Sequence, residues 1–542
     1  MARSIAYLRP VANEPVFDYA PGSPERKELK ETLTALKNEA PELPMWIGGE
    51  RVETGRLVEL QPPHERGHVL CHYHQGDETH INQAIDAALA AQKEWRRTPW
   101  EDRAAIFLKA ADLISGPYRA KVNAIAMLGQ SKNAFQSEID AVCEFVDFLR
   151  YNAEFMTEIY EDQPSSPPGF WNRMEYRPLE GFVFAVPPFN FASIAGNLAC
   201  APALLGNTIV WKPSYQTNYI AQLYMEILHA AGLPPGVINL IYAPGRVAGG
   251  VALTHPDLAG VHFTGSTGTF QYMWRTIGEN IVGYRSYPRI VGETGGKNFV
   301  LVHPSANAQE VVTALSRGAF EYQGQKCSAA SRAYIPSNLW DKIKQGLLND
   351  LSSFTMGSVE NFGNFVNAVI DKAAFRRITG YIDKAEADGQ EIIAGGNYDQ
   401  SQGWFIEPTV IIAEDPKYTT MCEEIFGPVL TLYIYDEGRF DETLKLVDET
   451  SPYGLTGSIF ATERSAIAYA TSALEHAAGN FYINDKPTGA VVNQQPFGGA
   501  RASGTNDKAG SKMNLYRWLS ARSIKETFVP PTDYRYPFLS ME

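Results

Sequence analysis

A cysteine in a glycine-bounded loop is the first candidate for chemistry. Cys327 occurs in the segment Gln-Gly-Gln-Lys-Cys-Ser, just past a predicted helix over residues 308–322, and Gly324 marks the stop of that helix. A thiolate is a strong nucleophile, and a neighbouring cation such as Lys326 favours it. Most free cysteines are small buried apolar groups, and the other four fit that description. Cys327 is therefore the predicted nucleophile.

Glu293 ends a short apolar strand, and Gly295 and Gly296 then allow a tight turn. A glutamate near apolar walls can have a raised pKa and act as a general base. The alternative for this pattern is a solvated glutamate in a turn.

Asn190 lies among prolines and aromatic residues, in Pro-Pro-Phe-Asn-Phe, at the end of a predicted buried strand. An amide in such surroundings needs a hydrogen-bonding partner. It could donate to a developing oxyanion, or it could pack against the backbone of a turn.

Two segments indicate a dinucleotide site. Gly265 and Ser266 follow a predicted strand and open a predicted helix, whose N-terminus could bind a pyrophosphate. Lys212 and Ser214 close a neighbouring strand and offer an ammonium and a hydroxyl at the edge where nucleotides bind. The first segment differs from the G-x-G-x-x-G pattern, so each is weak evidence by itself.

These residues need a scaffold, and the chain from residue 175 onward alternates between strand and helix patterns. Such alternation is typical of a parallel, doubly wound α/β sheet, and a second α/β segment covers about residues 289–480. An alternating piece over residues 523–528 predicts a terminal strand, paired either with a partner subunit or as an ordinary edge. The other predicted strands are residues 181–186, 207–212, 238–242, 258–263, 299–302, 333–335 and 429–435, and predicted helices include 25–37, 137–158, 192–205 and 220–231.

Length and composition narrow the class of protein. A chain of 542 residues with 44% hydrophobic and 20% charged residues is an ordinary globular protein of several domains. The formal charge of −14 argues against a nucleic-acid partner. Residues 181–211 carry no charge, but their prolines and asparagines favour buried structure over a membrane helix.

The sequence also allows predictions about the cellular compartment and about metal binding. Five scattered cysteines indicate a reducing compartment, and residues 1–6 show no export or organelle signal. We therefore expect a cytoplasmic protein, or a mitochondrial matrix protein if a presequence is missing from this chain. A histidine-rich segment could suggest zinc, but no second ligand pair follows, so we expect surface histidines and no metal. Its members are His64, His68, His72, His74 and His80, with Cys71 among them.

Taken together, these motifs resemble those of the aldehyde dehydrogenases, in the order expected of that family, over roughly residues 45–528. Three segments are more narrowly similar to its pyrroline-5-carboxylate dehydrogenase branch: residues 189–191, 325–329 and 497–506. The family motifs are Asn190, Lys212-Pro213-Ser214, Phe263-Thr264-Gly265-Ser266, Glu293-Thr294-Gly295-Gly296-Lys297, Gly324-Gln325-Lys326-Cys327, Glu424-Ile425-Phe426-Gly427-Pro428 and Pro496-Phe497-Gly498-Gly499.

The resemblance implies an architecture. It consists of a doubly wound Rossmann-type NAD domain, an α/β catalytic domain and a small β oligomerisation flap. The expected boundaries are an N-terminal extension (1–44), the NAD domain (45–170 and 187–292), the flap and tail (171–186 and 508–542) and the catalytic domain (293–507). A homodimer or higher homo-oligomer is the expected assembly.

The resemblance also implies a reaction, the NAD-dependent oxidation of L-glutamate γ-semialdehyde to L-glutamate, the second step of proline catabolism. Cys327 attacks the aldehyde, Asn190 and the Cys327 N–H hold the oxyanion, and Glu293 activates water to release the acid. Two alternatives are other enzymes: a CoA-acylating semialdehyde dehydrogenase, or a dehydrogenase for a semialdehyde of another chain length. A third is a non-catalytic structural or binding protein that retains the site as a relic.

Binding roles are carried over residue by residue. Lys212, Ser214, Gly265, Ser266, Glu424 and Phe426 are expected at NAD. Ser328, Gly489 and Ala490 would anchor the substrate carboxylate, Phe191 and Phe497 would enclose its methylenes, and Glu144 would lie near the mouth of the site. One departure is Tyr215, where many relatives carry a carboxylate that disfavours NADP.

Overall fold

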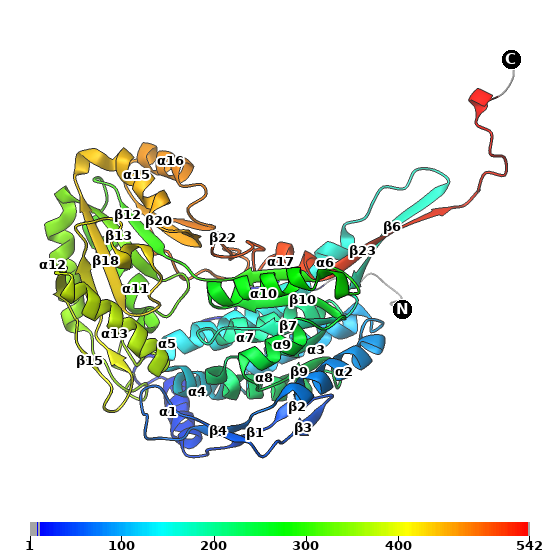
Figure 1. The fold of residues 1–542 in the computed structure, drawn as a ribbon, viewed down its shortest axis with the longest axis horizontal. Coiled ribbons are helices and arrows are strands. Elements are labelled where there is room, and N and C mark those ends of the chain that lie inside the picture. Colours follow the sequence, from blue (N-terminus) through cyan, green and yellow to red (C-terminus); the bar gives the residue numbers. More distant parts are fainter. Residues whose placement is uncertain (1–7, 9–10, 540–542) are drawn as a thin grey trace.

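The structure is a computed structural model that describes residue 8 and residues 11–539. The prediction about an export signal in residues 1–6 concerns residues outside this described part. Two seven-stranded sheets with helices packed around them form the body of the molecule, side by side in Figure 1. The predicted α/β class, with doubly wound sheets, is confirmed.

The first sheet contains the predicted strands of the dinucleotide site. Five neighbouring strands of this sheet are parallel to one another. Two strands from the N-terminal part of the chain extend the sheet at one edge, and each runs antiparallel to the strand before it in the sheet. β7 (Phe182–Val186), β8 (Thr208–Trp211) and β10 (Leu258–Thr264) are almost entirely buried, which explains why their sequences are mostly apolar. The strand order is β11 (Arg289–Glu293), β10 (Leu258–Thr264), β7 (Phe182–Val186), β8 (Thr208–Trp211), β9 (Ile238–Leu240), β2 (Met45–Ile47) and β3 (Glu50–Val52).

Helices connect and cover these strands. α2 (Glu78–Trp95) packs against β7, β8 and β9, and α7 (Ala192–Leu204) packs against β7, β8 and β10. α8 (Asn218–Ala231) ends at Gly232, whose φ of 106° is left-handed, as its position at a helix end requires. The uncharged segment 181–211 forms β7, α7 and β8, so the prediction of buried structure is confirmed. No helix in the described part of the chain is long and apolar enough to span a bilayer.

The helix predicted over residues 137–158 is not uniform. It consists of a short α5 (Ala134–Ser137), a π-helix η1 (Glu138–Glu144) and α6 (Phe145–Glu161). A π-helical turn holds more residues than an α-helical turn and is frequent at functional sites. Here it carries three acidic residues, Glu138, Asp140 and Glu144, on a helix that packs against α7.

The second sheet is also covered on both faces. In β12, Phe299 and Leu301 belong to one apolar cluster, while Val300 and Val302 belong to another, because alternate side chains of a strand point to opposite faces. Six strands are parallel and only β14 runs against its neighbour. The order is β14 (Glu391–Ala394), β17 (Thr409–Ile412), β18 (Val429–Tyr435), β13 (Ala330–Pro336), β12 (Asn298–Val302), β20 (Thr456–Phe460) and β21 (Asn480–Ile483).

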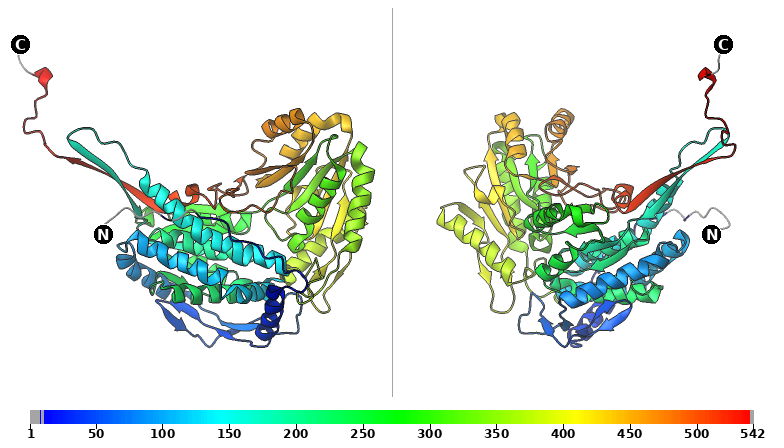
Figure 2. Two further views of the ribbon diagram at one scale, coloured as in Figure 1. Left: turned by 180° about the vertical axis from the view of Figure 1, so that it is seen from behind. Right: turned by 45° about the vertical axis from the view of Figure 1, so that its right-hand side comes forward.

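A two-stranded arm projects from the body, as both views in Figure 2 show. The predicted terminal strand is present as β23 (Leu519–Thr527), and it pairs antiparallel with β6 (Phe170–Pro178) of the same chain. Of the two pairings considered for this strand, the structure therefore contains one within the chain.

Candidate functional site

The loop that carries Cys327 has an unusual backbone. α11 (Ala308–Phe320) ends two residues before the predicted point, since Tyr322 and Gln323 adopt left-handed φ values of 51° and 55°. The Gln323 amide donates to the carbonyls of Ser131 (3.1 Å) and Ala368 (2.8 Å). These bonds offset a conformation that is otherwise unfavourable for residues other than glycine.

The Cys327 backbone is fixed from the other side by Asn298. The Asn298 amide donates to the Cys327 carbonyl at 2.7 Å, and a Cβ atom at Gly296 would lie only 2.4 Å from the same carbonyl oxygen. Glycine at 296 therefore permits the Glu293 segment to pass directly beside the nucleophile loop.

Three carboxyl groups lie close enough to Cys327, which is 8% exposed, to influence the pKa of its thiol. Burial raises the pKa of Cys327, and the charges of Glu293, Glu424 and Glu144 raise it further. The thiol is therefore neutral in this state of the protein, and forming the thiolate requires a proton acceptor. These carboxyl groups come from β11, the loop before β18 and η1, so the fold gathers three separate predicted site residues near the sulfur.

Glu293 ends β11, and its Oε1 atom is buried and lacks a hydrogen-bond partner among the described residues. Burial raises the pKa of Glu293 to about 8, while the charge of Lys508 opposes the shift. A cavity of 20 Å³, lined by Glu293, Thr505 and Lys508 among others, lies beside it and is large enough for one water molecule. The solvated-turn alternative is thus wrong, and the carboxyl group has the setting of a general base.

Asn190 is buried in the loop between β7 and α7. Its amide donates to the carbonyl of Gln325 at 3.1 Å, so it faces the nucleophile loop. Gln130 donates to the carbonyl of Phe189 at 2.5 Å and holds the preceding residue in place. Of the two interpretations, the structure contains the contact with loop backbone, two residues before Cys327, and the oxyanion role remains a prediction.

The dinucleotide residues lie at the carboxyl ends of the parallel strands. Ser266 caps α10 (Thr267–Glu279) by accepting the N–H of Thr269 at 3.3 Å. Lys212 follows β8, and burial lowers its pKa to about 8. A Cβ atom at Gly268, in the first turn of α10, would meet no atom within 4 Å among the described residues. An open helix N-terminus fits a pyrophosphate.

Glu424 lies against the Glu293 loop. Its Oε1 accepts the N–H of Gly296 at 2.7 Å, and a Cβ atom at Gly295 would lie 2.4 Å from Oε2. The ring of Phe426 lies edge-on to that of Phe189, with centroids 5.7 Å apart. This brings the segment before β18 to the loop that precedes Asn190.

Two of the segments predicted to bind the substrate lie side by side. The hydroxyl groups of Ser328 and Thr488 are 2.7 Å apart, and Thr488 directly precedes Gly489 and Ala490. Gly489 has a φ of 98°, which favours glycine there. Sequence analysis did not identify Thr488, because no pattern connects it to Ser328.

Two further groups near the site also lacked a sequence signal. The Asp371 carboxylate accepts from the hydroxyl of Tyr215 (2.9 Å) and from the amide of Gln216 (2.8 Å). A carboxylate therefore lies beside Tyr215 after all, supplied from the start of α13 (Lys372–Ala387). Lys132 and Asp140 form a buried ion pair behind the loop of Asn190.

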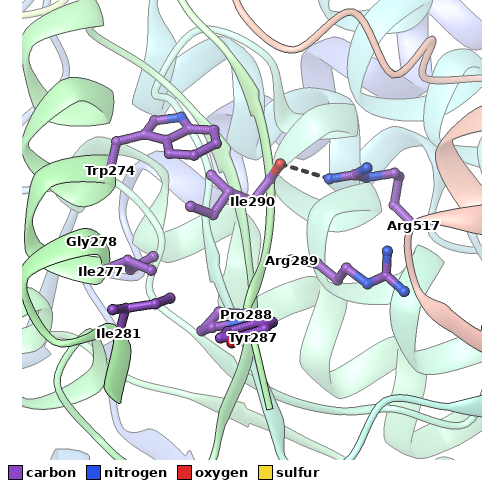
Figure 3. Close-up of a pocket in the computed structure, with 9 residues that line it drawn as sticks. All are labelled: Trp274, Ile277, Gly278, Ile281, Tyr287, Pro288, Arg289, Ile290 and Arg517. Carbon is purple, nitrogen blue, oxygen red and sulfur yellow. Dashed lines mark hydrogen bonds between the residues drawn. The ribbon is translucent and has the colours of Figure 1, made fainter. Parts of the chain in front are cut away.

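The histidine segment and one surface hollow lie outside this group of residues. His64 and His74 are each 3% exposed, so the expectation of surface histidines is wrong for these two, and the described residues contain no cluster suited to a metal ion. A hollow of about 580 Å³ lies between α10 and β11, beside Arg517 (Figure 3). None of its lining residues is a predicted catalytic or binding residue.

The sequence is similar to those of known proteins. The model of the aldehyde dehydrogenase family matches residues 50–524. The chain is 50% identical over 531 residues to the mitochondrial delta-1-pyrroline-5-carboxylate dehydrogenase of Dictyostelium discoideum, covering 97% of this chain and 95% of that protein. It is 50% identical over 533 residues to the delta-1-pyrroline-5-carboxylate dehydrogenase of Agaricus bisporus, covering 98% and 97%.

Solved structures agree. The delta-pyrroline-5-carboxylate dehydrogenase of Mycobacterium tuberculosis, bound with NAD, superposes with a TM-score of 0.96 at 49% identity, with both chains covered completely. The 1-pyrroline-5-carboxylate dehydrogenase from Thermus with bound NAD reaches a TM-score of 0.90 at 29% identity, covering 96% of this chain and all of that one.

Proposed function

Because the chain belongs to the aldehyde dehydrogenase family, we propose that it oxidises L-glutamate γ-semialdehyde to L-glutamate with NAD. The semialdehyde forms when water opens 1-pyrroline-5-carboxylate. One observation carries the proposal: a buried thiol, a buried carboxyl group with a raised pKa and an asparagine amide converge where the parallel strands end. Relatives of this chain at about half identity carry the name of this enzyme.

The first step is addition of the Cys327 sulfur to the aldehyde carbon. The thiol proton goes to a neighbouring carboxylate, for which Glu293 and Glu424 are the candidates because both influence the ionisation of the sulfur. The Asn190 amide and the Cys327 N–H hold the oxygen of the tetrahedral adduct. Ser266 and Glu424 would help to hold NAD, which would supply the hydride acceptor for this adduct. Stabilising the adduct is where the protein contributes most to the rate.

Glu293 serves the second half of the reaction. The thioester on Cys327 must be hydrolysed, and this needs a water molecule that loses its proton as it attacks. The Glu293 carboxylate accepts that proton, and its apolar surroundings keep its pKa near the working pH. The small cavity behind it offers a place for water.

The substrate end of the site explains the preference for an amino-acid aldehyde. Ser328 and the N–H groups of Gly489 and Ala490 would bind the α-carboxylate. Phe191 and Phe497 would lie on either side of the methylenes, and Glu144 would lie near the mouth. The hydrogen bond between Ser328 and Thr488 supports this assignment, because it joins the two segments that would share the carboxylate.

The cofactor residues fit NAD. Lys212 and Ser214 would lie at the adenosine ribose, Gly265 and Ser266 at the pyrophosphate, and Glu424 with Phe426 at the nicotinamide ribose. The Asp371 carboxylate beside Tyr215 supports NAD over NADP, because it would repel a 2′-phosphate.

A direct assay tests the function. NADH formation from 1-pyrroline-5-carboxylate is measured beside a plain aliphatic aldehyde, with NADP in place of NAD, and with and without CoA. We expect the pyrroline substrate with NAD to give the highest kcat/KM. We expect CoA to have no effect, because Glu293 activates water to hydrolyse the thioester. A preference for the aliphatic aldehyde would overturn the substrate assignment, and CoA dependence would favour an acylating enzyme.

Asn190→Ala should lower kcat by about 10²–10³, because it removes one oxyanion donor from the adduct. NAD affinity should stay within about twofold, since the amide contacts the nucleophile loop. Steady-state kinetics and an NAD titration measure the two effects. An unchanged kcat would show that the amide serves packing alone.

We further propose that the protein is a homodimer or a higher homo-oligomer. The arm of β6 and β23 exposes Trp171, and Phe528 follows it in a similarly exposed position. The apolar hollow of Figure 3 lies near the base of this arm, next to Arg517. Exposed apolar area of this kind is typical of an interface. A cytoplasmic location, with the mitochondrial matrix as the alternative, remains a prediction.

A further inference from the structure

A buried ion pair lies behind the loop of Asn190. The side chains of Lys132 and Asp140 are each 1% exposed, and the Lys132 ammonium donates to the Asp140 carboxylate. Burying two charges is costly unless each completes its hydrogen bonds. The contacts that complete them lead directly to the catalytic loops.

Asp140 holds the first turn of α7. Its Oδ2 accepts the N–H of Ala192 and its Oδ1 accepts the N–H of Ser193, both at 3.0 Å. The first N–H groups of a helix have no partner within the helix, so a carboxylate there is stabilising. Asn190 lies immediately before this turn, so Asp140 determines the direction in which the chain leaves Asn190.

Lys132 contacts the two loops that must meet. Its ammonium nitrogen lies 4.7 Å from the ring centroid of Phe191 and 4.6 Å from that of Tyr322. Phe191 follows Asn190, and Tyr322 belongs to the left-handed segment that leads to Cys327. Cation–π contacts with both rings therefore tie the oxyanion loop to the nucleophile loop.

Ser193 extends this group to Glu144. Its hydroxyl oxygen lies 2.7 Å from Asp140 Oδ1 and 2.7 Å from Glu144 Oε2. A hydroxyl has one proton to donate, so it cannot donate to two ionised carboxylates at once. Asp140 is paired with Lys132 and accepts two N–H bonds, so Glu144 is the protonated partner and donates to Ser193.

A protonated Glu144 also agrees with its surroundings. Burial and the charge of Asp140 raise the pKa of Glu144 to about 8. A neutral Glu144 adds no negative charge beside the Cys327 thiol. Lys132, Asp140 and Ser193 together therefore influence Asn190, Phe191 and Glu144.

We propose that Lys132, Asp140 and Ser193 are positioning residues for the reaction, which hold the Asn190 amide, the Phe191 ring and Glu144 in register with Cys327. The inference rests on the function proposed above. It predicts that a loss within this group lowers the rate of the chemical steps more than it weakens NAD binding.

The test compares Asp140→Asn with Asp147→Asn. Asp147 is 3% exposed and lies on α6, where it accepts from Glu14 N (2.7 Å) and Asn13 Nδ2 (2.8 Å), so it anchors the N-terminal segment instead of α7. We expect Asp140→Asn to lower kcat about 10–100-fold, less than loss of the oxyanion donor itself, and to slow iodoacetamide alkylation of Cys327. The KM for NAD should change less than about threefold. Asp147→Asn should lower the Tm but leave kcat unchanged.

Other outcomes remain decisive. If the wild type is active and Asp140→Asn has the same kcat as Asp147→Asn, the positioning role is overturned. If the wild type itself is inactive, the proposed function is overturned. If Asp140→Asn does not fold, Ser193→Ala decides, because it removes a hydroxyl and no charge. A loss of kcat of about fivefold with unchanged NAD affinity supports the proposal, and wild-type kcat overturns it.

Discussion

Replacing Cys327 with serine should reduce NADH formation from 1-pyrroline-5-carboxylate by at least about 10³. A hydroxyl is a much weaker nucleophile than a thiol and ionises with more difficulty. The carboxyl groups of Glu293 and Glu424 disfavour an alkoxide at position 327 still further, since each adds negative charge near a buried site when it is ionised. Steady-state rates in wild type and variant, at saturating NAD, give the ratio.

The matched control for this variant is Cys71→Ala. Cys71 is fully buried in β5 (Cys71–His74), and the chemistry does not use it. Its loss should lower the Tm slightly and leave kcat within about twofold. Binding of NAD to Cys327→Ser, followed by tryptophan fluorescence, should be preserved. Turnover of the serine variant at more than a tenth of the wild-type rate would contradict a covalent mechanism at this residue.

Glu293→Gln should separate the two halves of the reaction. Hydride transfer precedes hydrolysis, so the variant should release about one equivalent of NADH per site in a burst and then slow by about 10²–10⁴. The amide has the size of the carboxyl group but cannot accept a proton from water. Rapid-mixing measurements of NADH absorbance resolve the burst from the steady state.

The pH dependence follows from the same group. A base must be ionised, so with a pKa of about 8 the hydrolytic rate of the wild type should rise with pH up to and through 8. Because the folded pKa lies above the unfolded value, folding favours the protonated form, and the stability it contributes is lost as pH rises from about 4.5 to 8. Glu293→Gln should therefore gain in urea stability relative to wild type between pH 6 and pH 9.

An exposed glutamate provides the control. Glu526 lies on the arm, where it pairs with Arg173 at 3.0 Å, and Glu526→Gln should show neither a burst nor a pH-dependent change in relative stability. If Glu293→Gln instead shows no burst and a slow first turnover, the residue acts before hydride transfer, and its assignment to hydrolysis is wrong.

Local sequence patterns predicted most of the secondary structure. The apolar run of β7, the turn at Gly232 and the strand–turn–helix sequence around Ser266 were all predictable, because each depends on residues close together in the chain. Where a prediction was wrong in detail, a distant contact was the cause. α11 ends early because Gln323 bonds to Ser131 and Ala368, which no local pattern contains.

The candidate site was also predictable in part from local sequence and in part only from the tertiary structure. The identities of Cys327, Glu293 and Asn190 as candidates came from the sequence alone, because residue type and neighbouring glycines or prolines limit their chemistry. Only the tertiary structure decided that the Glu293 Oε1 atom is buried, that Asp371 lies beside Tyr215, and that the π-helix brings Asp140 under the first turn of α7. Burial and charge pairing depend on which surfaces meet, and segments more than a hundred residues apart meet only once the chain has folded.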